Sequence, residues 1–296
     1  MGTRRPLCLA AAVCVLLTPA VGAKPPSPTD LDWLREQCGR DAALAYQSRG
    51  TIYLAELATG ETAKVGRGVC PEFSPDGSKL AWVDKGVVRG RMRSAPEEGE
   101  PEVHVIARGA DGESGVHWIS NDEVVFYTEE GWRRCTLGGE PKPVPALDKL
   151  GQGAHECDVK LREDGVWALV KRGRWADSTG KRGEAPGACS YSLSPDGRSV
   201  TGLHRGHKRC TLTPIAEGGA EGELRWIYDH KKSKGFDNHR WSSNDGRFVA
   251  CQDEKAECMV VMMLGSTRCT RMGEKGGGEM YGDFTVGVGE GDPWPD

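Results

Sequence analysis

Three histidines occupy related positions in this sequence: His117, His155 and His239 each lie beside a segment that recurs along the chain. Imidazole nitrogens bind divalent metals, and a carboxylate such as Asp158 or Asp237 would complete a ligand set. A metal held there would acidify a water molecule or a substrate proton. However, the sequence lacks the tight ligand spacing of known metal motifs. The stronger interpretation is that these histidines are polar loop residues, so we expect no cofactor, with a divalent metal as the alternative.

The densest group of polar and aromatic residues is Gly235-Phe-Asp-Asn-His-Arg-Trp241. We expect this segment to be a loop, where binding residues are often displayed on a rigid scaffold. Its polar side chains would read a sugar or a peptide together with His117 and His155; they are Asp237, Asn238, His239 and Arg240. The simpler alternative is an ordinary turn followed by a core Trp.

The recurring segment occurs five times, and each copy contains an Asp. Gly follows this Asp in four of the copies. The turn residues are Asp76, Gly77, Asp122, Asp164, Gly165, Asp196, Gly197, Asp245 and Gly246. Successive Asp residues are 32 to 49 positions apart. Repeats of this size indicate a stacked array or a β-propeller.

Each copy favours the same local structure. Ser74-Pro75-Asp76-Gly77 suits a type I turn, because Pro presets φ, Asp accepts a local hydrogen bond and Gly tolerates positive φ. An apolar residue precedes each turn, and a β-rich run follows it; the apolar residues are Phe73, Trp118, Leu161, Leu193 and Trp241. Strand, tight turn and strand form a hairpin, and the repeat length leaves room for two more strands. Glu123 replaces the Gly of the second copy and predicts a different turn there.

The aromatic, Ser-Pro-Asp-Gly and apolar strand of each copy resemble the TolB-like class of bacterial propellers, over roughly residues 42 to 286. The resemblance implies that the strand before each turn is innermost, so that the three histidines would face a central channel. The repeat occurs in envelope scaffolds, in propeller domains attached to peptidases, and in lyases that use a channel metal. The resemblance therefore implies a fold and leaves the function open.

The two ends of the chain predict a sixth repeat unit. Residues 42 to 65 contain three strand-like runs, and Met280–Val286 is an isolated strand-like run. If the C-terminal strand pairs with the N-terminal three, both sheet edges are covered. We expect an all-β propeller of four-stranded blades, six in number with five as the alternative. Its parts are a signal peptide (1–23), a linker and short N-terminal segment that forms a turn or a helix (24–41), the propeller (42–286) and a tail (287–296).

The first 23 residues have the pattern of a secretory signal: Arg4-Arg5, an apolar stretch, and Val21-Gly22-Ala23 before the cleavage site. We therefore expect an exported protein, periplasmic or extracellular. The apolar stretch is too short to span a bilayer. The formal net charge of −4 argues against nucleic acid as a partner.

Nine of the eleven cysteines lie after this signal. Disulfides are expected in an oxidising compartment, and Cys251 and Cys258 flank a short turn between two strand-like runs. They are the pair we predict, while the odd number requires at least one unpaired thiol. Several others would be buried thiols that behave as small apolar residues.

No Gly-x-Ser-x-Gly or His-Glu-x-x-His motif occurs in the sequence. The function predicted is a non-catalytic binding or scaffold module in the cell envelope. Its partner would be an envelope protein, or a peptide or glycan, at one end of the ring. The alternative is a channel-centred, metal-dependent lyase or hydrolase acting on acidic sugars.

Overall fold

Antiparallel sheets make up almost all of the described chain. The computed structural model describes residues 31–286 except 40, 95–100, 113–114, 151–156, 186–189, 205–208, 216–235, 242, 244–245, 254–257, 264–268 and 273–279. The helices are α1 (Leu31–Cys38) and α2 (Pro145–Asp148). The strands are β1 (Ala43–Ser48), β2 (Thr51–Glu56), β3 (Thr62–Arg67), β4 (Val69–Phe73), β5 (Lys79–Asp84), β6 (Val87–Met92), β7 (His104–Arg108), β8 (Val116–Trp118), β9 (Glu123–Thr128), β10 (Gly131–Thr136), β11 (Lys142–Pro143), β12 (Cys157–Leu161), β13 (Trp167–Lys171), β14 (Arg174–Asp177), β15 (Arg182–Glu184), β16 (Ser190–Leu193), β17 (Ser199–His204), β18 (Arg209–Pro214), β19 (Phe236–Trp241), β20 (Phe248–Asp253), β21 (Cys258–Met263), β22 (Cys269–Met272) and β23 (Met280–Thr285).

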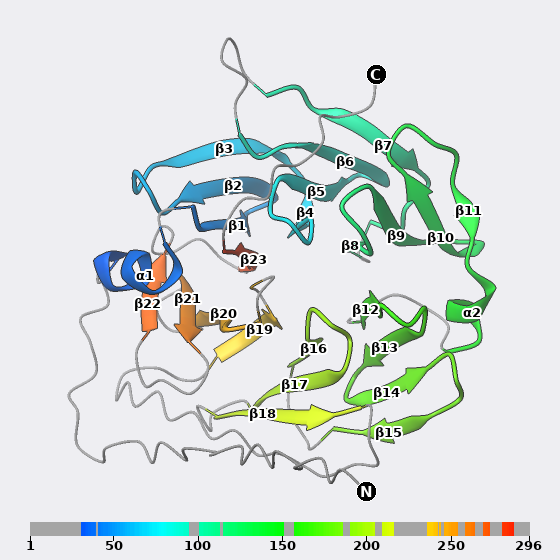
Figure 1. The fold of residues 1–296 in the computed structure, drawn as a ribbon. Helices are drawn as coiled ribbons and strands as arrows, with labels where there is room; N and C mark the ends of the chain where they lie inside the picture. Colours follow the sequence, from blue (N-terminus) through cyan, green and yellow to red (C-terminus); the bar gives the residue numbers. More distant parts are fainter. Residues whose placement is uncertain are drawn as a thin grey trace, which may run out of the picture.

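Within these described residues, the strands form five four-stranded sheets and one three-stranded sheet. Their orders are β23-β1-β2-β3, β4-β5-β6-β7, β8-β9-β10-β11, β12-β13-β14-β15, β16-β17-β18 and β19-β20-β21-β22. The sheets are arranged radially, with the first strand of each order nearest the centre (Figure 1). Each inner strand contacts the inner strands of the two neighbouring sheets. This is an all-β, propeller-like arrangement, as the repeats predicted.

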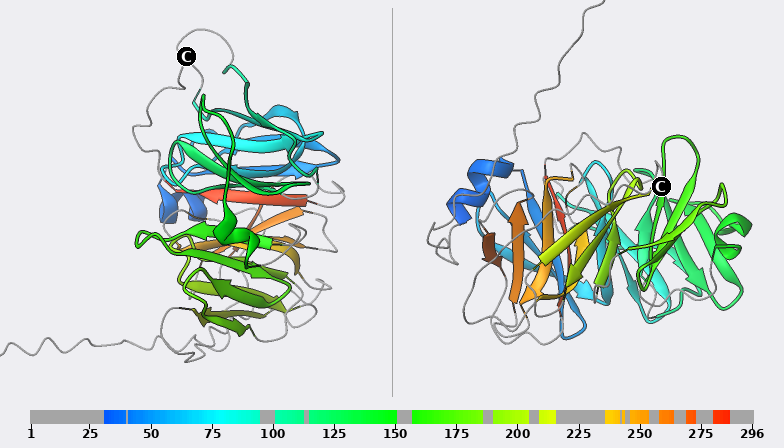
Figure 2. Two further views of the ribbon diagram at one scale, coloured as in Figure 1. Left: turned by 90° about the vertical axis from the view of Figure 1, so that its right-hand side faces the viewer. Right: turned by 90° about the horizontal axis from the view of Figure 1, so that it is seen from below.

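The first sheet joins the two ends of the chain. Strand β23 pairs along its whole length with β1, from Met280 opposite Ser48 to Thr285 opposite Ala43. Helix α1 lies outside the sheets, beside β22 (Figure 2). Cys38, at its end, is buried against residues of two sheets, Leu57 and Phe248 among them. No helix in the described part of the chain is long and apolar enough to cross a bilayer.

The predicted turns form as their residues dictate. In the first copy, Gly77 has φ of 72° and its N–H donates to the Ser74 carbonyl at 2.8 Å. The Asp76 carboxylate accepts from the Ser74 hydroxyl at 2.6 Å and from the Ser78 N–H at 3.0 Å. The Ser74 hydroxyl oxygen also accepts from the Lys79 N–H at 2.9 Å and so fixes the start of the next strand. The side chains of this tetrapeptide thus close the hairpin locally.

The second turn differs, as Glu123 predicted, and it contacts the first. The Ile119 N–H donates to the Glu123 carbonyl at 3.0 Å, whereas in the first copy the Ser74 N–H donates to the carbonyl of Lys79, so the second connection is one residue shorter. The Asn121 amide oxygen accepts from the Asp76 N–H at 3.1 Å, and Asp122 pairs with the Lys79 ammonium at 3.2 Å. The altered turn therefore links two neighbouring sheets.

The hydrogen bonds of Asp76 make the stability of the fold depend on pH. Burial raises the pKa of this carboxyl, but the hydrogen bonds from Ser74 and Ser78 and the nearby Lys79 outweigh it, and the net pKa is lowered from 3.8. The ionised form therefore stabilises the fold above the unfolded-state pKa, and that stability is lost as pH falls through the lower folded-state pKa. We expect Asp76→Asn to lower the free energy of unfolding by about 1 to 2 kcal/mol at pH 7.

Urea unfolding of the wild type and Asp76→Asn between pH 7 and pH 3 measures this effect. The gap between the two proteins should begin to narrow as pH falls past 3.8, because the unfolded wild-type chain then takes up a proton at Asp76 while the folded carboxyl stays ionised to lower pH. Glu102→Gln, at an exposed acid, is the control and should give the same curve as the wild type. A gap that stays constant down to pH 3 would contradict the assignment.

Candidate functional site

A buried carboxylate connects three inner strands near the centre of the sheets. Glu72 on β4 is only 4% exposed. Its carboxylate accepts from the Lys160 ammonium at 2.8 Å, from the Trp118 N–H at 3.2 Å and from Nδ1–H of His117 at 3.0 Å. One acid of the first repeat thus binds residues of the second and third.

His117 continues this network to the next strands. The side chain is buried, and the Nδ1 atom that contacts Glu72 also lies 3.5 Å from the Asp158 carboxylate of β12. Strand β12 is the next inner strand after β8. The other oxygen of Asp158 accepts from the Ser192 hydroxyl at 2.6 Å and from the Leu193 N–H at 2.8 Å. A continuous polar path therefore crosses the inner strands β4, β8, β12 and β16.

The network residues occupy equivalent positions in their repeats. Glu72, His117, Lys160 and Ser192 each precede the apolar residue that ends the inner strand. Their cross-strand partners are Ala81, Val125, Ala168 and Thr201 respectively. Asp158 lies two residues before Lys160 and so shares its face of β12.

The sequence predicted His117 here and named Asp158 as a ligand, but it missed Glu72, Lys160 and Ser192. Aligning the repeats on the apolar residue rather than on Asp would have found them.

The other predicted site residues do not join this network among the described side chains. His155 lies outside the described residues. Asp237, Asn238, His239 and Arg240 belong to the inner strand β19, so the predicted loop is wrong. The register of β19 against β20 shifts between Asp237 and Arg240, which places Asn238 and His239 in its irregular part. Their side chains are outside the described set, so their role in binding remains a prediction.

The predicted disulfide is not supported by the strand register. Cys258 of β21 lies opposite Asp253 of β20, and Cys251 lies opposite Val260. The two cysteines are therefore diagonal neighbours with Cα atoms about 7 to 8 Å apart, whereas the Cα atoms of a disulfide are usually about 4.4 to 6.8 Å apart. The side chains of both are outside the described set, so their pairing remains a prediction.

The described cysteine side chains are thiols rather than disulfides; they are Cys38, Cys70, Cys135 and Cys157. Burial raises the pKa of the Cys135 thiol, and the negative charges of Glu140 and Glu123 raise it further. This thiol behaves as a small buried residue, as expected for several of the cysteines.

The inner network has the residue types of a metal site but a different charge pattern. Among the described residues, no group of His, Cys, Asp and Glu is arranged to hold a metal ion. The Lys160 ammonium contacts Glu72 directly and supplies the positive charge that a metal would bring. A divalent cation would meet its repulsion at this place. The arrangement therefore suits a structural link between blades better than a metal centre.

Exposed cations lie on three of the described hairpins at one end of the sheets, while the equivalent hairpin β9–β10 carries the exposed acids Glu129 and Glu130. The hairpins β1–β2, β5–β6 and β13–β14 each join the second and third strands of a sheet through Arg49-Gly50, Lys85-Gly86 and Arg172-Gly173. Arg49, Lys85 and Arg172 have φ of 50°, 49° and 48°, and all three are exposed. Two residues with positive φ form a type I′ turn, which favours Asn, Asp or Gly in the first position.

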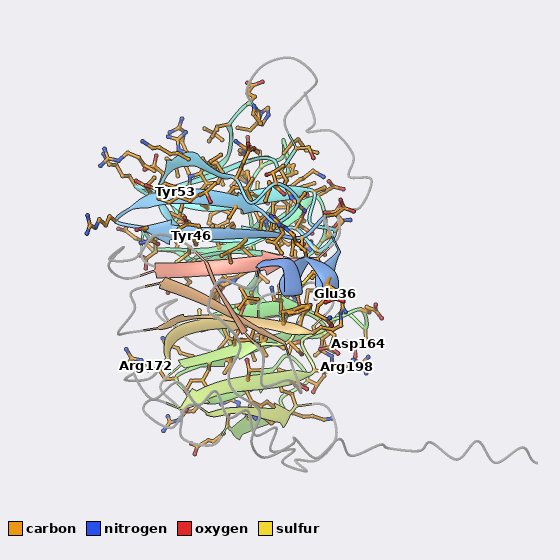
Figure 3. The ribbon with its side chains drawn as sticks, turned by 90° about the vertical axis from the view of Figure 1, so that its left-hand side faces the viewer. Glu36, Tyr46, Tyr53, Asp164, Arg172 and Arg198 are labelled. Carbon is orange, nitrogen blue, oxygen red and sulfur yellow. The ribbon has the colours of Figure 1, made fainter. Side chains whose placement is uncertain are left out.

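These hairpins lie opposite the Asp-Gly turns. Antiparallel strands place the turn between the first and second strands at one end and the next hairpin at the other. Figure 3 shows Arg172 at the end of the molecule opposite Asp164 and Arg198, which belong to two Asp-Gly turns. We call the three hairpins that carry Arg49, Lys85 and Arg172 the basic hairpins. The sequence did not identify them, because the positive φ of a basic residue is visible only in the backbone.

Comparison with solved structures identifies the fold. TolB from Acinetobacter baumannii matches with a TM-score of 0.54 and 15% identity, covering 83% of this chain and 67% of that chain. A chain from a Nidogen/Laminin complex matches with a TM-score of 0.51 and 12% identity, covering 82% of this chain and 97% of that chain. No protein-family model and no curated protein matches the sequence. At these identities, the similarity shows a TolB-like β-propeller fold and leaves the activity open.

Proposed function

We propose that this chain, which has a TolB-like β-propeller fold, is an exported, non-catalytic binding or scaffold module of the cell envelope. The blades are six in this proposal, and the pairing of β23 with β1 closes their ring. The buried polar residues of the inner strands bind one another from blade to blade. Such a network stabilises a rigid support, and the ends of the ring then carry the binding surface.

The observation that carries the proposal is the set of basic hairpins at one end. Among the described residues, four non-glycine residues have positive φ, and three of them are Arg49, Lys85 and Arg172. A bulky residue in this conformation costs about 1 kcal/mol, and such outliers cluster at functional sites. Three exposed cations at equivalent places favour a protein partner with an acidic surface.

Site-specific photocrosslinking in cells that export the protein tests the proposal. A photoreactive amino acid at Lys85 samples the end with the basic hairpins, and one at Arg198 samples the opposite end. We expect a protein partner to be captured from Lys85 and lost in an Arg49→Glu/Arg172→Glu background. N-terminal sequencing should show that the exported chain starts at Lys24. Capture from Arg198 alone, capture of glycan alone, or no capture from either position would overturn the proposal.

The alternative is a channel-centred metal enzyme, and one observation favours it. His117 lies between the carboxylates of Glu72 and Asp158, which are common companions of metal-binding histidines. The Lys160 ammonium at Glu72 argues against it. The two functions therefore differ in a measurable quantity, the metal content.

We expect the purified, tag-free protein to contain no stoichiometric metal. Inductively coupled plasma mass spectrometry of the wild type, His117→Ala and His239→Ala measures this directly, with thermal melts to show that each variant is folded. Stoichiometric metal that is lost in both variants would establish the channel site and overturn the non-catalytic proposal. Metal that neither substitution affects would place it elsewhere and leave the inner network structural.

A further inference from the structure

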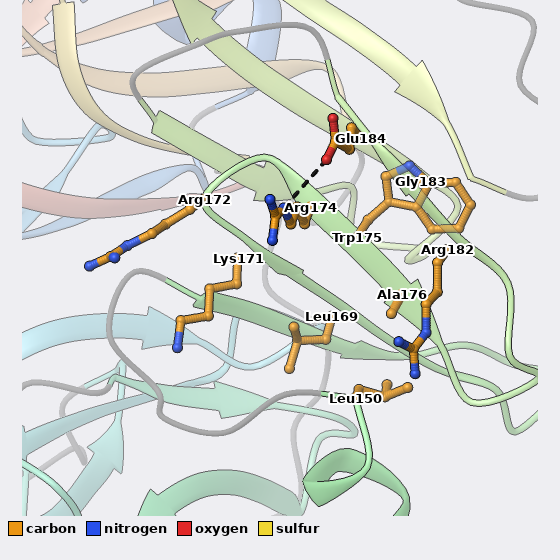
Figure 4. A pocket seen from close by; sticks show the side chains of 10 residues that line it. All are labelled: Leu150, Leu169, Lys171, Arg172, Arg174, Trp175, Ala176, Arg182, Gly183 and Glu184. Atoms are coloured by element: carbon orange, nitrogen blue, oxygen red, sulfur yellow. Dashed lines mark ion pairs between the residues drawn. The ribbon is translucent and has the colours of Figure 1, made fainter.

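A pocket of ≈ 820 Å³ lies against β13, β14 and β15, away from the inner network (Figure 4). Ligand pockets usually have volumes of about 300 to 1,000 Å³, so this one has the size for a small organic molecule. Leu150, which follows α2, forms another part of its lining. The pocket therefore adjoins the outer strands of one sheet and the connection that leads to this sheet.

The strand register explains why apolar and cationic residues meet there. Leu169 of β13 lies opposite Ala176 of β14, which lies opposite Arg182 of β15. Side chains of opposite residues share a face of the sheet, so these three form one row. Lys171, Arg174 and Glu184 form the next row on the same face. Figure 4 shows Leu150, Leu169 and Ala176 between Lys171 and Arg182.

The charges in this lining are strongly unequal. Four of the lining residues are cations and one is an acid; they are Lys171, Arg172, Arg174, Arg182 and Glu184. The acid pairs with Arg174 at 3.4 Å, and the two side chains are 74% and 82% exposed. Such an exposed pair contributes little, about 0 to 1 kcal/mol. A ligand anion can therefore take the place of Glu184 beside Arg174.

A second pocket has the opposite balance of charges. It has a volume of ≈ 800 Å³, and its lining contains Asp111, Glu129 and Glu130 beside Arg108 and Arg133. Acids there outnumber cations, so an anion would be repelled. Arg133, which pairs with Glu130 at 2.6 Å, is thus a matched control for the arginines of the first pocket.

We infer that the pocket on β13, β14 and β15 binds a small amphipathic organic anion. Arg174 and Arg182 are diagonal neighbours on the sheet, and their long side chains can reach one carboxylate or phosphate group. Leu150, Leu169 and Ala176 receive the apolar body of the ligand. Arg172 lines this pocket and also belongs to the basic hairpins, so the test of this site avoids Arg172.

Isothermal titration with a matched set of probes tests the inference. Phenyl phosphate and benzoate combine an anion with an apolar ring, while inorganic phosphate and phenol each supply one part. We expect at least one combined probe to bind about tenfold or more tightly than either part, which corresponds to 1.4 kcal/mol. Which of phenyl phosphate and benzoate binds more tightly identifies the anionic group. Binding should weaken as the salt concentration rises.

Arg174→Gln and Arg182→Gln should each weaken this binding about tenfold, whereas Arg133→Gln should leave it unchanged. Arg174 and Arg182 are exposed, whereas the Arg133 side chain is 18% exposed, and melting temperatures will show that the variants are folded. Equal affinity for the combined probes and their parts would overturn the inference. So would binding that Arg174→Gln and Arg182→Gln leave intact, or that Arg133→Gln weakens equally.

Discussion

Replacing Glu72 with Ala is expected to destabilise the protein by about 3 to 5 kcal/mol, because breaking a buried ion pair leaves an uncompensated buried charge. The Glu72 side chain is 5% exposed and contacts the Lys160 ammonium and the His117 ring. The substitution also removes the acceptor of the Trp118 N–H. These groups come from three repeats, so the loss weakens the packing of neighbouring blades.

Urea unfolding followed by tryptophan fluorescence measures this free energy. Glu130→Ala is the control, because that acid also forms an ion pair, with Arg133, but its side chain is 81% exposed. We expect the control to change stability by less than about 1 kcal/mol. Glu72→Gln/Lys160→Met, which removes both charges, should recover part of the loss. A loss below about 1 kcal/mol in Glu72→Ala would show that the network does not hold the blades together.

The second large effect is expected from Asp122→Ala. Lys79 has no exposed side-chain surface, and Asp122, whose side chain is 53% exposed, pairs with it at 3.2 Å. Without Asp122, a buried ammonium keeps only the more distant charge of Asp76. We expect a loss of about 3 kcal/mol. Lys79→Met should be nearly neutral, because Met fills the space and the remaining carboxylate stays in contact with water.

The contrast between the two substitutions is the test. Both remove the same ion pair, so equal losses in thermal and urea unfolding would show that the pair itself, rather than burial of the ammonium, dominates. A larger loss in Lys79→Met would contradict the argument. Asp122→Asn should lie between the wild type and Asp122→Ala, since its amide oxygen still accepts a hydrogen bond.

Local sequence determined most of the strand and turn pattern. Ser74-Pro75-Asp76-Gly77 closes a hairpin with hydrogen bonds that span five residues or fewer, so its conformation depends on residues adjacent in the chain. The Glu at position 123 likewise predicted a changed turn. The pairing of β23 with β1 followed from the need to cover sheet edges. These inferences required no knowledge of how the sheets face one another.

The candidate site depended on features that the sequence does not display. Glu72 and His117 are 45 residues apart in the sequence. They meet only because their sheets are neighbours and each lies on the innermost strand of its sheet. The predicted loop at Phe236–Trp241 was wrong, because its polar residues suggested solvent exposure while the backbone pairs with β20. Sequence reasoning judged each residue by its own polarity, whereas burial is decided by neighbouring strands.

The sequence by itself determined a repeating all-β chain, because turn chemistry and strand propensity act over a few consecutive residues. Only the tertiary structure decided which polar residues pair and where cations gather. Nothing in the sequence of its repeat indicated a role for Lys160, whose ammonium lies 2.8 Å from the Glu72 carboxylate in the structure. Arg49, Lys85 and Arg172 lie at the same end because equivalent hairpins of radially arranged sheets point the same way. Such positions follow from the register and rotation of whole sheets, which no short stretch of sequence encodes.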